Sequence, residues 1–155
     1  MENLKKQIQP ILDNYRSGNL TQAELLGKKL ITENPNVVFL YNLLGLIYVG
    51  QKKIDLAQKY YEKGIEIDPN FAEIYNNLGL LFTHHKLDND KAENFFKKSI
   101  SLNQNNPEAY NNLGSLYTSL DKDDKALNCF KKSIEINPNF FHAYHNIGVI
   151  YVEVG

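Results

Sequence analysis

The sequence is poor in residues that many binding and catalytic sites need. Among its 155 residues there is one cysteine, Cys129, one arginine, Arg16, and no tryptophan. A single cysteine excludes an internal disulfide bond and agrees with a reducing compartment. With one arginine, the chain has little capacity to hold phosphate or carboxylate groups through the bidentate guanidinium fork. The sequence also lacks a phosphate-binding glycine loop and the HExxH and GxSxG signatures, so we expect no catalytic residues and no cofactor.

Long apolar runs are missing as well. The N-terminal segment MENLKKQIQP has no apolar stretch of signal-peptide length, and no later segment approaches the ~18 uninterrupted apolar residues typical of a membrane span. The formal net charge is -1, so no overall field attracts nucleic acid or an anionic membrane. With 43% hydrophobic and 23% charged residues, the composition is that of a folded soluble chain, which we expect to be cytoplasmic.

What the sequence does contain is an internal repeat. Four similar segments, YNLLGLIY, YNNLGLLF, YNNLGSLY and YHNIGVIY, start 34, 35 and 34 residues apart, at Tyr41, Tyr75, Tyr110 and Tyr144. The same spacing separates Ala23, Ala57, Ala92 and Ala126, and the prolines keep the same phase at Pro35, Pro69 and Pro138. Three series with one period predict a repeat array. The one extra residue of the second full repeat is expected in the turn HHKLDND.

Each repeat is predicted to form two packed helices. Tyr75, Gly79 and Phe82 lie at positions 0, 4 and 7 of one helical face, and a partner helix begins near Ala92. Glycine inside a helix costs about 1 kcal/mol relative to alanine, so its recurrence in every first helix from Gly45 to Gly148 predicts close contact between paired helices. The expected helices are 3–16, 20–33, 38–50, 54–67, 72–85, 89–102, 107–119, 123–136 and 141–154.

The period, the aromatic–Leu–Gly–aromatic first helix, the central alanine and the terminal proline together resemble the tetratricopeptide repeat. The resemblance is strong over residues 38–155 and weaker over 1–37, where Pro10 is expected to interrupt the first helix. It implies an all-α fold, a right-handed superhelix of stacked antiparallel helix pairs. The expected domain, 1–155, comprises a degenerate repeat at 1–37, repeats at 38–71, 72–106 and 107–140, and the first helix of a truncated repeat at 141–155.

The resemblance also implies a binding scaffold whose concave surface is lined by the first helix of each pair. The candidate peptide-binding residues on that surface are Asn42, Leu46, Glu73, Asn76, Asn77, Leu80, His84, Glu108, Asn111, Asn112, Ser115, His142, His145 and Asn146. Packed helices lie about 8–10 Å apart, so we expect these residues to form one continuous strip.

Asparagine is unusually frequent on this strip, although it is a poor residue for helix interiors. A carboxamide can both donate to and accept from a peptide group, so repeated asparagines suit the binding of an extended peptide backbone. The arrangement is similar to the asparagine ladder in the repeat region of O-linked N-acetylglucosamine transferases, in which Asn77, Asn112 and Asn146 would be the rungs. The alternative is that the amides connect neighbouring helices, or reflect a composition with 20 asparagines.

The sequence therefore predicts a non-catalytic protein-interaction scaffold that binds an extended peptide or a segment of a partner protein. The alternative is a substrate- or partner-recruiting arm of a larger enzyme, such as a glycosyltransferase or sulfotransferase. The strip has no Lys or Arg between residues 72 and 119, so a neutral or mildly basic partner is expected rather than an acidic chaperone tail. His142 and His145 share a helical face without a cluster of Cys or carboxylates, and we expect no metal site there.

The last predicted helix, 141–154, is expected to need a further helix to bury its apolar residues. Its apolar residues crowd the final two turns, at Ile147, Val149, Ile150, Tyr151, Val152 and Val154, where a terminal cap would be polar. The sequence thus predicts that the natural chain continues with a second helix, and that this chain associates with itself through the C-terminal helix.

Overall fold

The computed structural model describes residues 2–154, and side chains from residue 4 to residue 152. Within this range the chain forms α-helices and one π-helical turn, with no strand. The elements are α1 (Glu2–Arg16), α2 (Leu20–Glu33), α3 (Val38–Gly50), α4 (Ile54–Ile67), α5 (Ala72–Leu81), η1 (Phe82–Lys86), α6 (Asn89–Leu102), α7 (Pro107–Thr118), α8 (Asp123–Ile136) and α9 (Phe141–Val154). The helices predicted from the sequence are confirmed, with ends that agree within one residue except at η1. None of these helices is long and apolar enough to cross a membrane.

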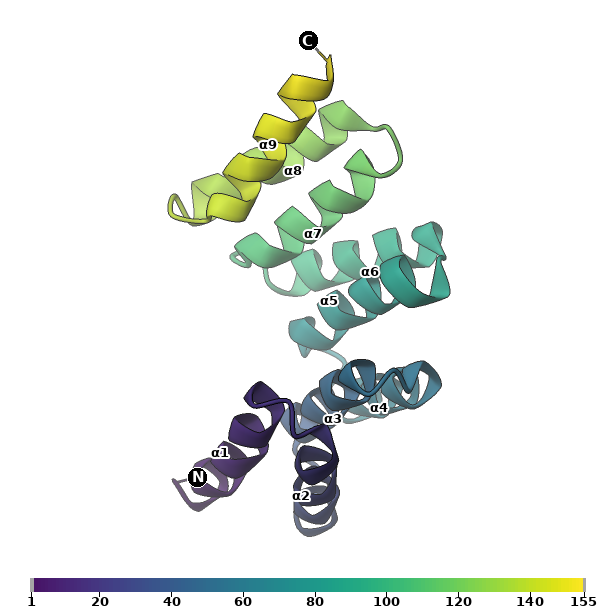
Figure 1. Ribbon diagram of the computed structural model, residues 1–155, viewed down its shortest axis with the longest axis vertical. Helices are drawn as coiled ribbons and strands as arrows, with labels where there is room; N and C mark the ends of the chain where they lie inside the picture. Colours follow the sequence, from purple (N-terminus) through teal and green to yellow (C-terminus); the bar gives the residue numbers. More distant parts are fainter. Residues whose placement is uncertain (1, 155) are drawn as a thin grey trace. The chain divides into compact units, whose positions relative to one another are not determined.

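The chain divides into two compact units, and the boundary falls between Ile74 and Tyr75. In the first unit the antiparallel pair α1–α2 packs against the pair α3–α4, chiefly through α2 and α3 (Figure 1). Its core includes Ile11, Leu44 and Tyr61, each at most 1% exposed. The grouping of all repeats into one domain stays a prediction.

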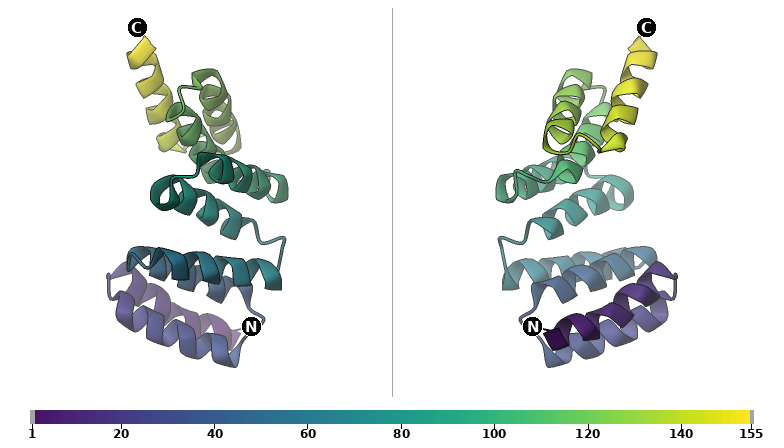
Figure 2. Two further views of the ribbon diagram at one scale, coloured as in Figure 1. Left: turned by 90° about the vertical axis from the view of Figure 1, so that its right-hand side faces the viewer. Right: turned by 90° about the vertical axis from the view of Figure 1, so that its left-hand side faces the viewer.

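In the second unit the pair α5–α6 lies beside the pair α7–α8, and α9 packs on both helices of the latter pair (Figure 2). The core of this unit is built around Phe96 and Phe130, which are almost completely buried. Both units therefore consist of antiparallel helix pairs packed side by side, and the predicted all-α class is confirmed.

The helical glycines allow an aromatic ring from the second helix to lie directly on the first. A Cβ atom on Gly45 would come within 2.2 Å of the Tyr61 ring, and one on Gly114 would come within 2.5 Å of the Phe130 ring. Gly79 has the same relation to Phe96. The packing expected from the sequence is thus confirmed at these three positions. Gly148 differs, since no atom of the described residues lies within 4 Å of its Cβ position.

Asparagine and aspartate side chains hold the turns between repeats. The carboxamide oxygens of Asn103 and Asn137 each accept a hydrogen bond from the backbone N–H two residues further on, and the Asp68 carboxylate does the same. Asn106 caps the N-terminus of α7 by accepting from the backbone of Glu108 and Ala109. Short polar side chains compete well for backbone groups in turns, so part of the asparagine content is structural.

The extra residue of the 35-residue repeat lies in η1, which overlaps the first three residues of the predicted HHKLDND turn. In the two 34-residue repeats, the backbone N–H just after the first helix donates a hydrogen bond to the carbonyl oxygen five residues earlier. These bonds run from Lys53 to Tyr48 and from Lys122 to Tyr117. The equivalent bond from Asp88 reaches Phe82, six residues back. The additional residue is therefore absorbed as a π-turn that ends in Leu87, a left-handed residue with φ 54°.

Pro10 does not interrupt α1, contrary to the expectation from the sequence. Proline removes one backbone donor inside a helix, which commonly kinks or ends it. Here the helix continues to Arg16, and the next turn buries Ile11 almost completely. The Pro10 carbonyl also accepts a hydrogen bond from the Asn14 side chain at 2.8 Å. Burial of the following turn offsets the lost backbone hydrogen bond.

Candidate peptide-binding groove

The first helices of the second unit, α5, α7 and α9, are connected by hydrogen bonds between asparagine side chains. Asn112 Nδ2 donates to Asn76 Oδ1 at 3.1 Å, and Asn146 Nδ2 donates to Asn111 Oδ1 at 3.0 Å. In each pair the donor belongs to the later repeat. The amides therefore connect neighbouring helices, which is the structural role that the sequence left open as an alternative.

The predicted asparagines fall into two groups by burial. Asn42, Asn76 and Asn111 occupy equivalent positions of three repeats and are less than 10% exposed. The predicted strip placed them at the surface, but they are buried. The equivalent second residues, Asn77, Asn112 and Asn146, are half-buried. A carboxamide that donates one N–H to a neighbouring helix still carries a second N–H and an oxygen with two lone pairs. Asn112 and Asn146 therefore keep hydrogen-bonding capacity at the surface.

A hollow of about 460 Å³ on the predicted strip lies between α5–η1 and α7. Leu80, Thr83 and His84 line one wall, and Asn112, Ser115 and Ser119 line the opposite wall. Phe96 and Leu116 lie behind these walls, and each is only 1% exposed. Four of the candidate residues, Leu80, His84, Asn112 and Ser115, thus line one hollow, whose walls carry both apolar and polar side chains.

A second hollow, of about 250 Å³, lies between α7 and α9. It is lined by Ser115, Thr118, Ser119, Phe130, Asn146 and Val149. Asn146 here occupies the position that Asn112 occupies in the first hollow, and its amide also lies 3.4 Å from the Ser115 hydroxyl. Ser115 and Ser119 line both hollows, so the two are neighbours along the face of α7.

The remaining candidates lie outside these hollows. Leu46 is half-buried on α3, and Glu73 and Glu108 are exposed near the starts of α5 and α7. His142 and His145 are exposed on α9, where the His142 ring lies 5.6 Å from the Phe140 ring and 6.3 Å from the Phe141 ring. Among the described residues, no group of three or more His, Cys, Asp or Glu side chains could hold a metal ion.

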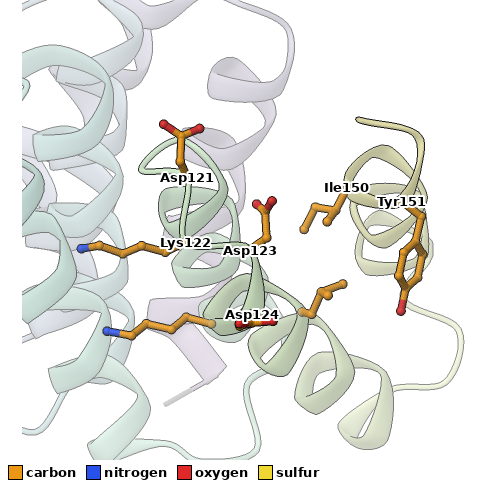
Figure 3. A pocket seen from close by; sticks show the side chains of 8 residues that line it. Asp121, Lys122, Asp123, Asp124, Ile150 and Tyr151 are labelled. Carbon is orange, nitrogen blue, oxygen red and sulfur yellow. The ribbon is translucent and has the colours of Figure 1, made fainter. Parts of the chain in front are cut away.

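A further hollow, of about 500 Å³, was not predicted from the sequence (Figure 3). It lies between the start of α8 and the end of α9, with Asp121, Asp123 and Asp124 on one side. Figure 3 shows the Ile150 side chain pointing from α9 toward α8, whereas the Tyr151 ring lies on the side of α9 away from α8. No periodic pattern in the sequence predicted this hollow.

Two polar clusters at the joints between repeats were also missed. Within the first unit, the Tyr48 hydroxyl donates to the Glu24 carboxylate at 3.2 Å, and Lys28 and Lys53 pair with the same carboxylate at 2.5 and 3.2 Å. The hydrogen bond from Lys28, with those from Gln51 and Lys53, lowers the pKa of Glu24 to about 2. These side chains fasten α2 to α3.

The equivalent cluster of the second unit lies 69 residues further along the chain, with Tyr117, Glu93 and Lys97 in the places of Tyr48, Glu24 and Lys28. The Tyr117 hydroxyl donates to Glu93 at 2.9 Å, and Lys97 pairs with Glu93 at 2.6 Å. The hydrogen bond from Lys97 is the main cause of a lowered pKa at Glu93. The spacing of 69, two repeat periods, was the available sequence signal.

Cys129 lies in α8 and is partly buried. Burial raises the pKa of its thiol to about 11, with a smaller contribution from the Glu93 carboxylate. The thiolate is the reactive form of cysteine, and at neutral pH a thiol with this pKa is almost entirely protonated. The Cys129 thiol is therefore a weak nucleophile at neutral pH.

Comparison with known proteins supports the repeat assignment. Two family profiles, both described as tetratricopeptide repeat, match the chain, one at residues 38–71 and 107–140 and the other at residues 60–94 and 129–155. No curated protein sequence gives a significant match.

Solved structures are similar over most of the chain. The crystal structure of MamA is 30% identical, with a TM-score of 0.75 over 92% of this chain and 83% of that chain. Pseudomonas aeruginosa pilF is 22% identical, with a TM-score of 0.87 over 98% of this chain and 69% of that chain. The first tetratricopeptide module of Spaghetti (RPAP3), bound to the HSP90 peptide SRMEEVD, is 25% identical, with a TM-score of 0.70 over 76% of this chain and 92% of that chain. The profiles, the helix pairs and the glycine–aromatic packing agree, and the chain belongs to the tetratricopeptide repeat family.

Proposed function

We propose that this protein is a non-catalytic scaffold that binds an extended segment of a partner protein along the first helices α5, α7 and α9. The observation that carries the proposal is the pair of neighbouring hollows on those helices, of about 460 and 250 Å³. Their polar side chains supply hydrogen-bond donors and acceptors for a peptide, and Leu80 and Val149 provide apolar surface for its side chains. A tetratricopeptide module with similar architecture is known with a bound peptide.

The charge of the surface favours a neutral or mildly basic segment. Glu108 is exposed at the N-terminal end of α7, and no Lys or Arg lines either hollow. The peptide in the RPAP3 structure, SRMEEVD, is acidic at its end. An acidic tail would find no cation in these hollows to pair with, so we expect this chain to select a different class of peptide.

The test uses Ser119, which lines both hollows and is exposed. Peptides would be selected from a random library displayed on phage with the wild-type protein as bait. Ser119→Arg places a long side chain across both hollows and should reduce binding of the selected peptides at least tenfold. Asn128→Arg, at an exposed position of α8, is the matched control and should leave their affinity unchanged. Selected peptides that bind all three proteins equally would show that the hollows are not the site.

The asparagines are less suitable for this test. Asn112 and Asn146 hold neighbouring helices together, so their replacement by alanine changes packing as well as any contact with a peptide. A loss of binding in such variants would not separate the two roles. The His84 and Ser119 side chains are exposed, and their substitution leaves the hydrogen bonds between helices in place.

The exposed face of α9 supports a second proposal, self-association of the chain. Tyr144, Tyr151 and Val152 are 51%, 59% and 81% exposed, and they lie around Gly148, whose surface is uncovered. Grouped apolar side chains of this kind favour association. Sedimentation velocity over a range of concentrations should show dimers of the wild type and a shift to monomers in Tyr151→Glu. A wild-type protein that stays monomeric at high concentration would refute this second proposal.

A further inference from the structure

The exposed face of α9 is an apolar strip on one side of the helix. Its members are spaced by three and four residues, which places them on a common face: Phe141, Tyr144, Gly148 and Tyr151. The three aromatic side chains are 74%, 51% and 59% exposed. Ala143 and Ile150, at most 2% exposed, lie on the opposite side of α9, which packs on α7 and α8 (Figure 2). The strip therefore points away from the unit to which α9 belongs.

The strip contains both parts of a contact that other repeats make between their own two helices. In three helix pairs an aromatic ring of the second helix lies on a glycine of the first, as Phe130 lies on Gly114. Gly148 is the equivalent glycine of α9, and its Cβ position is open. Tyr144, one turn earlier on the same face, is an exposed ring. A second copy of α9 can therefore offer a ring to this glycine and a glycine to this ring.

An antiparallel arrangement satisfies both contacts at once. A two-fold axis at the level of Asn146, midway between Tyr144 and Gly148, places each of these residues opposite the other one in the second copy. The same register places Phe141 opposite Tyr151, because each lies three residues further from the axis. In a parallel pair every residue faces itself, and Gly148 opposite Gly148 leaves a gap between the helices. The strip is therefore self-complementary only when the two copies are antiparallel.

The charge of the chain is consistent with a closed pair. From residue 141 to residue 152 the sequence contains no Asp, Glu, Lys or Arg, so two copies of this segment meet without like charges from these residue types. The exposed residues of α1 include Lys5, Gln9 and Asp13, so the first helix offers no comparable apolar strip. A strip that matches itself favours a two-fold dimer over a head-to-tail chain of copies.

The area of the strip sets the expected strength of the pair. An aromatic side chain buries about 150–250 Å², so the three rings at their exposed fractions can bury about 350 Å² per copy. Val152, 81% exposed at the edge of the strip, adds to this area. The total for two copies stays below the ~1,200 Å² at which stable interfaces begin. We therefore expect the dimer to form at high protein concentration and to dissociate on dilution.

We infer that the chain forms a two-fold dimer through antiparallel copies of α9, with each Tyr144 ring on the partner's Gly148 and each Phe141 ring beside the partner's Tyr151. This inference rests on the proposed self-association and defines its geometry. In the dimer the second copy of α9 takes the place on α9 that α8 has on α7.

The test exchanges charges across the pair. Phe141→Glu and Tyr151→Lys each place a charge opposite an aromatic ring, so each variant alone should raise the dimer dissociation constant at least tenfold in sedimentation velocity. In an equimolar mixture the glutamate of one variant faces the lysine of the other. Heterodimers should therefore form at concentrations at which each variant alone is monomeric. Both positions are exposed, and circular dichroism checks that each variant keeps its helix content.

Two further mixtures are controls for the register and the direction. Phe141→Glu mixed with Tyr144→Lys places no opposite charges face to face in the inferred register and should give no heterodimer. Phe141→Glu mixed with Phe141→Lys pairs the charges only in a parallel arrangement and should also give none. Heterodimers in either control, or none with Tyr151→Lys, would overturn the antiparallel pairing.

Gly148→Leu tests the contact between ring and glycine. Its side chain occupies the place of the partner's Tyr144 ring, so the dimer dissociation constant should rise at least tenfold. Val149→Leu is the matched control, because Val149 is 37% exposed but points about 100° away from Gly148 around the helix. It should leave the dissociation constant unchanged. Equal effects of the two substitutions would contradict the ring contact.

The outcomes separate the geometry from the self-association on which it rests. If the wild type dimerises but the charge exchange restores no heterodimer and Gly148→Leu has no effect, self-association stands and the inferred pairing fails. If the wild type stays monomeric at high concentration, both fail.

Discussion

Helices α7 and α9 carry almost the same sequence pattern, but they are buried to very different extents. Tyr117 is 5% exposed, and the equivalent Tyr151 is 59% exposed. Gly114 lies under the Phe130 ring, whereas the Cβ position of Gly148 is open. The aromatic–glycine pattern therefore encodes a face that can receive a second helix. The pattern does not ensure that this face is buried, because the helix that buries the face of α7 is α8, a separate segment of the chain.

The polar contacts of the two helices with the preceding repeat differ in the same way. Tyr117 of α7 donates a hydrogen bond to Glu93 of the preceding repeat. The residue equivalent to Glu93 one repeat later is Leu127, which cannot accept a hydrogen bond from Tyr151. One repeat thus has a packed glycine and a polar joint, and the next has the same first helix without either. Helix α9 is therefore an internal control for α7.

The largest effect is expected for Phe130→Ala. Phe130 is fully buried against Gly114, and removal of a buried phenylalanine side chain typically costs about 3–5 kcal/mol through lost burial and the cavity that remains. Phe141→Ala on α9, where the ring is 74% exposed, should change the free energy of unfolding by less than about 0.5 kcal/mol. Urea denaturation followed by circular dichroism measures both. Equal losses would show that the hairpin packing does not control stability.

Gly114→Leu should have the next largest effect. Its side chain must displace the Phe130 ring, and such overpacking costs about 1–3 kcal/mol or more. Gly148→Leu meets no neighbour among the described residues and should be neutral, or should stabilise by up to about 1 kcal/mol through helix propensity. Thermal unfolding of the two variants tests the comparison. A destabilised Gly148→Leu protein would mean that the face of α9 is covered in solution.

The polar joint of α7 should make stability depend on pH. The Glu93 pKa is lowered in the folded state, so the bond contributes fully above the ordinary pKa of about 4.5 and is lost as the pH falls through the lowered value. Allowing for screening by water, we expect Glu93→Gln to cost about 1–2 kcal/mol at pH 7 and much less near pH 2. Urea titrations at both pH values give this difference. A cost that does not change with pH would contradict the role of the ionised carboxylate.

The smallest effect concerns the asparagine that joins α9 to α7. Asn146→Ala removes the donor to Asn111 and should cost about 0.5–1.5 kcal/mol. A double-mutant cycle with Asn111→Ala tests whether the two side chains act together, because replacing both should cost less than the sum of the single changes. Strict additivity would show that the hydrogen bond contributes nothing to the packing of α9.

The fold was largely predictable from local and periodic features. The period of 34–35 residues, the small residues facing aromatic residues and the turn residues between helices all act over short separations along the chain, and the helix bounds followed from them. Pro10 was the exception. Its effect on α1 depends on how firmly the next turn packs, which is a tertiary property.

The site was predictable only in part. Four of the predicted residues, Leu80, His84, Asn112 and Ser115, line one hollow, and their role in binding a peptide stays a prediction. The sequence could not show that the first asparagine of each pair is buried and the second half-buried, because adjacent helical positions point about 100° apart and neighbouring helices decide which one is covered.

The sequence by itself determined the repeat, its helices and the face on which helices pair, because these follow from spacing along one chain. Tertiary structure decided which amides bond to each other, how large the two hollows are, and that the extra residue forms a π-turn at Phe82–Lys86. Each of these depends on the distance and rotation between helices that come from different repeats. Side-chain packing sets that geometry, and no periodic pattern within a single helix contains it.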